Sequence, residues 1–94
     1  MDEIFQHYRG AFDQAFEVVQ TLILVANDAD FRIEILKRWP EGDYKPRVYK
    51  QVEVSVDSSP MLLWREYEMG YQVASDPEAA LKMAMAVISN RTGR

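Results

Sequence analysis

The sequence predicts a small α+β domain in the order helix, three strands, helix. Three observations support this. Apolar residues recur every three or four positions over residues 5–29, and apolar and polar residues alternate through the middle of the chain. Capping residues and a proline near position 76 then open a second helical segment. We therefore expect a three-stranded antiparallel meander, with a long N-terminal helix and a C-terminal helix packed on one face.

The first predicted element is a helix across residues 5–29. Its apolar side chains follow at spacings of three and four, which keeps them on one helix face. They are Phe5, Tyr8, Phe12, Ala15, Val19, Leu22, Ala26 and Ala29, with Phe16 and Ile23 in a neighbouring column. This stripe is longer than a three-stranded sheet can cover. The aromatic residues of its first half, Phe5, Tyr8, Phe12 and Phe16, are therefore predicted to form a dimer contact.

A competing interpretation makes residues 18–25 a strand that pairs with residues 31–38 through a turn at 27–30. Thr21, Ile23 and Val25 favour this strand because of their branched side chains. Strict alternation, however, would place Gln20 on the same face as the leucines at 22 and 24, so the helix is the preferred prediction.

Three strands are predicted between residues 31 and 73. Residues 31–38 alternate apolar and polar side chains, and the sequence Trp39 to Asp43 ends this strand with a proline and a glycine. Residues 47–56 place four valines on one side, and residues 61–73 form the third strand after a turn at 57–60. Short turns favour antiparallel neighbours, with the second strand central.

The last helix has the clearest start signal in the chain. Ser75 and Glu78 have the spacing of a capping box, and Pro77 suits the first helical turn. Between residues 79 and 88 only Lys82 is polar, so this helix is expected to be covered on two sides.

Composition indicates one domain of limited stability. The chain has 94 residues, is 48% hydrophobic, carries a net charge of −4 and has no cysteine. It has neither a long apolar run nor a secretory leader, which predicts a cytoplasmic protein with no membrane contact. Because domains of this size often gain stability by oligomerisation, the expected partner is a second copy or another protein.

Catalytic chemistry finds little support in the sequence. With no cysteine and with His7 as its only histidine, the chain lacks the usual zinc ligands and a histidine-based triad. Three glutamates of the second and third strands share one face; they are Glu53, Glu66 and Glu68. Arg32 and Arg38 project to the same side, so a charge-mixed surface is expected. No catalytic residue, metal site or cofactor is predicted.

Large side chains also fall on the outer face of the predicted sheet, away from the helices. They are Leu36, Tyr49, Leu62 and Trp64. An apolar patch rimmed by charge is typical of a protein contact, but a loop that folds over these residues would explain them equally well.

Nucleic-acid binding is the alternative function. Residues 32–50 carry a net charge of +3 and interleave cations with aromatic rings, a pattern that can hold single-stranded nucleic acid. The candidate contacts are Arg38, Tyr44, Lys45, Arg47, Tyr49 and Lys50. The order of elements resembles that of double-stranded-RNA-binding domains, which implies a basic start to the second helix; here Asp76 and Glu78 stand there. A non-catalytic interaction domain that forms a homodimer through its helices is therefore the preferred prediction.

Overall fold

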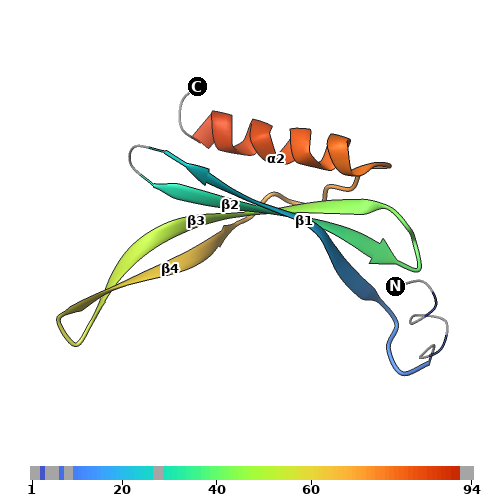
Figure 1. Ribbon diagram of the computed structural model, residues 1–94, viewed down its shortest axis with the longest axis horizontal. Helices are drawn as coiled ribbons and strands as arrows, with labels where there is room; N and C mark the ends of the chain where they lie inside the picture. The colour runs from blue at the N-terminus through green and yellow to red at the C-terminus, as the bar shows by residue number, and fades with distance from the viewer. Residues whose placement is uncertain (1–2, 4–6, 8–9, 27–28, 92–94) are drawn as a thin grey trace.

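The structure, a computed structural model, describes residues 3, 7, 10–26 and 29–91. Within these residues it is a four-stranded antiparallel sheet in the order β1-β2-β3-β4, with a helix on one face (Figure 1). The elements are β1 (Ala15–Val25), β2 (Asp30–Trp39), β3 (Tyr44–Val56), β4 (Ser59–Tyr67) and α2 (Pro77–Arg91).

The predicted long N-terminal helix is wrong, because residues 15–25 form strand β1. This strand pairs with β2 in a register that places Leu22 opposite Ile33. Its many β-branched residues fit a pleated surface, and spacings of three and four carry no face preference in a strand. Of the predicted dimer contacts, Phe5 and Tyr8 lie outside the described residues.

The two other aromatic residues of that predicted contact do not lie on a helix. Phe12 precedes β1, and Phe16 lies within it. The sheet therefore has four strands, and the predicted three-stranded meander is wrong as well. Both β2 and β3 are central strands, whereas only the second predicted strand was expected to be central.

A β-bulge explains why β1 lacks strict alternation. The register with β2 shifts between Val18 and Gln20, which leaves Val19 as the extra residue. Gln20 does share a face with Leu22 and Leu24, as strict alternation requires. On the N-terminal side of the bulge, however, Val18 pairs with Leu36 and lies on the outer face, opposite to Gln20, Leu22 and Leu24. The sequence pattern therefore matches neither a simple strand nor a helix.

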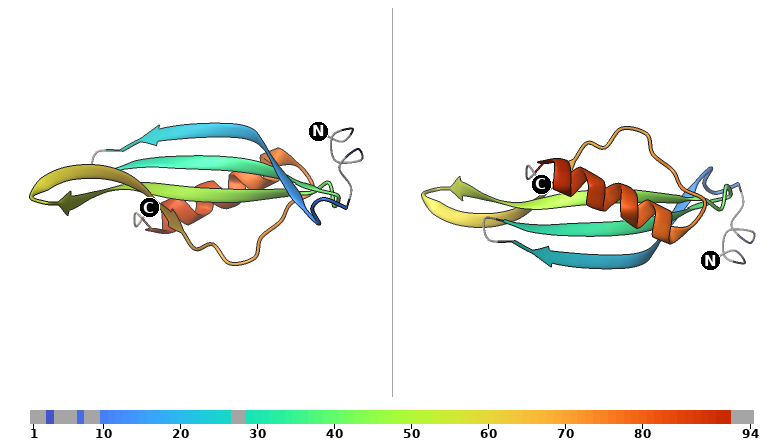
Figure 2. Two further views of the ribbon diagram at one scale, coloured as in Figure 1. Left: turned by 90° about the horizontal axis from the view of Figure 1, so that it is seen from below. Right: turned by 90° about the horizontal axis from the view of Figure 1, so that it is seen from above.

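A row of four residues crosses the helix-covered face of the sheet. Leu22, Ile33, Val48 and Tyr67 are successive partners in the four strands. The buried cluster contains Ile33 and Val48 together with residues of the helix and of the segment before it; the other members are Phe31, Ile35, Ala74, Ala80, Ala84 and Ile88. The small core therefore lies where α2 crosses β2 and β3 (Figure 2).

Helix α2 packs on the sheet through two alanines and an isoleucine. Ala80, Ala84 and Ile88 recur every four residues and are buried, so one face of the helix rests on the sheet. The backbone N–H of Ala79 donates to Oδ1 of Asp76 at 2.8 Å, so Asp76 caps the helix. The opposite side is exposed at residues such as Met85, and the sheet covers one side of the helix rather than the two expected.

Strand β4 separates from its neighbour β3 next to Pro46 of β3. The backbone N–H and C=O of Tyr44 both form hydrogen bonds with Ala74. The backbone groups of Tyr44 therefore point away from β2, toward the edge of β3 on which β4 lies. Pro46 is two residues further along β3 and has the same orientation, but it has no N–H to donate. Pairing with β4 consequently ends at Tyr67, and the chain returns to the sheet edge only at Ala74.

The far ends of β3 and β4 project beyond the helix as a two-stranded ribbon, residues 51–64, here called the arm (Figure 1). A two-residue turn closes it, with Asp57 and Ser58 both at positive φ, as a type I′ hairpin requires. The arm makes the molecule elongated. Its radius of gyration is 15.9 Å, whereas a compact domain of this length has about 12 Å.

Candidate interaction surfaces

The centre of the outer sheet face, opposite the helix, is a cluster of stacked polar and aromatic side chains. The guanidinium of Arg32 lies 4.4 Å from the ring centroid of Tyr49 and 5.2 Å from that of Trp64. The Tyr49 hydroxyl donates to Oε1 of Glu34 at 3.0 Å, and Nε of Arg32 lies 4.0 Å from Oε2 of Glu34. Cation–π attraction and this hydrogen bond together fix the four side chains across three strands.

The predicted outer patch is therefore not a continuous apolar surface. Leu36 is only 3% exposed and lies between Val18 and Lys45 of the neighbouring strands. Tyr49 and Trp64 are half-buried, with Arg32 over both rings. Leu62 is exposed and lies on the same outer face as Trp64, two residues away along β4.

Exposed apolar side chains gather instead at the edge strand β1 and on the arm. In β1 they are Phe16, Val18, Val19, Ile23 and Val25. In the arm they are Val56, Met61, Leu62 and Leu63. The β-branched run of β1 supported the competing strand interpretation of residues 18–25, but the preferred helix left this strand surface out of the predicted contacts.

The basic and aromatic residues of the nucleic-acid alternative do not form one surface. Arg47 and Tyr49 lie on the outer face, whereas Tyr44 and Lys50 lie on the helix-covered face, because side chains alternate along β3. Lys45 lies on the outer face with Arg47 by the same alternation. The Tyr44 ring lies 5.7 Å from Nζ of Lys37, and Tyr49 stacks under Arg32 as described above.

Two of the candidate nucleic-acid contacts, Arg38 and Arg47, are paired with carboxylates. Nε and Nη2 of Arg38 donate to the two carboxylate oxygens of Asp43 at 2.5 and 2.8 Å. Nε of Arg47 lies 3.8 Å from Oε2 of Glu66. The side-chain hydrogen bonds raise the pKa of Arg38 above its ordinary value and lower the pKa of Asp43 below its own. These pairs reduce the positive charge that a phosphate would meet.

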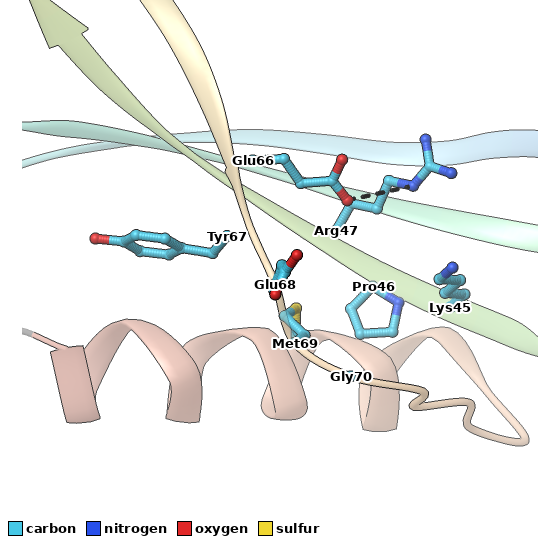
Figure 3. A pocket seen from close by; sticks show the side chains of 8 residues that line it. All are labelled: Lys45, Pro46, Arg47, Glu66, Tyr67, Glu68, Met69 and Gly70. Atoms are coloured by element: carbon cyan, nitrogen blue, oxygen red, sulfur yellow. Dashed lines mark ion pairs between the residues drawn. The ribbon is translucent and has the colours of Figure 1, made fainter.

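A pocket of about 260 Å³ opens where β4 departs from β3 (Figure 3). Its wall is made by two chain segments, residues 45–47 and 66–70. Pro46, which ends the pairing of the two strands, is one of the residues that line it. The charges around it are mixed, and two of its lining residues, Arg47 and Glu66, form an ion pair (Figure 3). The pocket therefore offers no excess of either charge to a ligand.

Other chemical features are few in the described part of the chain. Among these residues no group of three acidic or histidine side chains is placed to hold a metal ion, and Glu66 faces Arg47 rather than a second carboxylate. No described helix has the length and apolar character needed to cross a membrane. Comparison with protein-family models, curated proteins and solved structures finds no match to this chain.

The Arg38–Asp43 pair predicts a pH dependence of stability. The folded state lowers the pKa of Asp43, so its contribution to stability is complete above the unfolded value of about 3.9 and is lost as pH falls through the folded value. We expect an Asp43→Asn variant to have a lower urea midpoint at pH 7 and a smaller further loss between about pH 4 and pH 2. Urea unfolding followed by tryptophan fluorescence measures both.

An Asp43→Glu variant is the control, because it keeps the charge and disturbs the two-bond geometry. It should retain part of the acid-dependent loss that the asparagine variant lacks. Parallel pH profiles for the wild type and Asp43→Asn would show that this pair does not contribute.

Proposed function

We propose that this chain is a non-catalytic protein-interaction domain that acts as a homodimer. The observation that supports this most is its surface. The chain exposes 6542 Å², whereas a compact monomer of 10.9 kDa exposes about 5,600 Å². The chain therefore leaves on the order of 900 Å² more surface uncovered than a compact monomer of its size.

The position of the exposed apolar residues supports the same proposal. They concentrate on β1 and the arm, whereas the core occupies only the crossing of α2 with the two central strands. Apolar side chains grouped in this way are typical of contact surfaces. The contact proposed here lies on the sheet and not on an N-terminal helix, because residues 15–25 form strand β1.

Sedimentation equilibrium tests the proposal directly. Over about 1 to 100 µM protein we expect a monomer–dimer equilibrium with a concentration-dependent average mass. A chain that sediments as a monomer throughout this range would contradict the homodimer.

Nucleic-acid binding has weaker support, from the adjacent cations Lys45 and Arg47 on the outer face. The division of the other candidates between two faces and the ion pairs of Arg38 with Asp43 and of Arg47 with Glu66 reduce that support. Fluorescence titration with single-stranded and double-stranded oligonucleotides at two salt concentrations distinguishes the two functions. A salt-dependent affinity would favour nucleic acid, because phosphate contacts release counterions.

A further inference from the structure

The two edges of the sheet differ in how well they are protected against pairing with another strand. Strand β4 carries Pro60, Arg65 and Glu66, and charges and prolines at an edge oppose further pairing. Strand β1 contains neither proline nor lysine nor arginine, and its one charged residue is Glu17. Among the described elements, β1 is therefore the edge with the fewest features that prevent strand addition.

The second half of β1 is suited to pairing. Residues 20–25 follow β2 in continuous register with no bulge, so their outer edge presents a regular row of backbone donors and acceptors. Ile23 is 51% exposed and Val25 is 83% exposed, both on the outer face. The bulge at Val19 interrupts this regular edge and sets the limit of the pairing segment.

We propose that β1 pairs in antiparallel orientation with β1 of a second copy, centred on Ile23, so that one sheet continues through both copies. This inference rests on the proposed homodimer and names its surface. A two-fold axis perpendicular to the sheet then passes between the two Ile23 residues and keeps both helices on the same side. Leu22 lies opposite Leu24 of the second copy, and Thr21 lies opposite its Val25.

The choice of a second copy follows from self-complementarity. Between residues 21 and 25, every opposed pair in this register matches two residues suited to strands: isoleucine with isoleucine, leucine with leucine, and threonine with valine. Antiparallel pairing also places the two Glu17 carboxylates at opposite ends of the contact, so no like charges oppose each other. The Leu22–Leu24 pairs would extend the core, because both leucines already pack against the buried cluster.

Cysteine cross-linking tests the register, because the natural chain has no cysteine and an introduced thiol is unique. Opposed residues in an antiparallel pair have Cα atoms about 4.5–5.5 Å apart, a distance that a disulfide can span. An Ile23→Cys variant should therefore form a covalent dimer under mild oxidation. Thr21→Cys is the matched control, because its two copies would lie about 13 Å apart along the strands. We expect its cross-linking rate to be at least about tenfold lower.

A second measurement uses charge. Ile23→Lys places two like charges at the centre of the contact and removes two apolar side chains, so the dimer dissociation constant should rise by about 100-fold. Met85→Lys introduces the same charge on the exposed side of α2, away from β1 and the arm, and should leave association unchanged. Val56→Lys tests the arm. Circular dichroism establishes that the three variants keep the fold.

The outcomes separate this inference from the proposed function. A wild-type dimer that shows no preferred cross-link at Ile23 and survives Ile23→Lys overturns the β1 pairing and leaves the homodimer standing. Dissociation by Val56→Lys instead would place the contact on the arm. A wild-type monomer would overturn both.

Discussion

An Ile33→Ala variant is expected to lose about 2–5 kcal/mol of unfolding free energy. Ile33 is fully buried in the central strand β2, with Leu22 and Val48 as its cross-strand neighbours. Truncation removes apolar contacts and leaves a cavity that the rigid sheet cannot easily close. Because small domains have a total stability of only about 5–15 kcal/mol, this single change could leave a substantial fraction of the chain unfolded.

Urea unfolding at a fixed protein concentration, followed by tryptophan fluorescence, measures this loss. Val56→Ala provides the control, since Val56 is an exposed apolar residue at the end of the arm. It should cost less than about 0.5 kcal/mol. Equal losses in the two variants would mean that the core does not lie at the crossing of α2 with the sheet.

The central part of this fold could be predicted from the sequence because several signals agree there. In β2, apolar and polar side chains alternate from Asp30 to Ile35, and the strand is followed by a turn with Gly42 at positive φ. The start of α2 was predicted for similar reasons, because Pro77 and the residues around it are compatible with a helix start and with little else. The capping residue is Asp76, one position after the expected Ser75.

Strand β1 could not be predicted in the same way, because its pattern satisfies two periods at once. Val19, Leu22 and Ala26 fit a helical stripe, and the bulge at Val19 removes the strict alternation that would have identified a strand. Only pairing with β2 resolves the two possibilities, and that pairing is a tertiary interaction that local propensity does not contain.

The outer surface shows the same limit at the level of side chains. Alternation correctly places Tyr49 and Trp64 away from the helix, but it does not show whether they are free to bind. Their cover, the Arg32 guanidinium, comes from another strand and depends on the register between β2 and β3. A pattern of aromatic residues therefore predicted the position of these rings and not their accessibility.

The second large effect is expected at the helix, where an Ala84→Leu variant should lose about 1–3 kcal/mol. Ala84 is fully buried between α2 and the sheet, in the cluster that contains Ile33 and Val48. A leucine side chain does not fit this close approach without moving the helix away from the sheet, because protein cores have little free volume. The loss is expected even though leucine is itself a good helix former.

Ala86→Leu is the matched control, because Ala86 lies two residues further along α2 and is exposed. The two variants have the same change in helix propensity and side-chain volume, so the difference between their unfolding free energies reports the docking of the helix alone. We expect Ala86→Leu to stay within about 0.5 kcal/mol of the wild type.

Hydrogen exchange adds a local measurement: in Ala84→Leu the amides of α2 should lose protection before those of β2, since the sheet keeps its own backbone pairing. If the two leucine variants unfold alike, α2 does not rest on the sheet through its alanine face, and the two central strands must find their cover elsewhere.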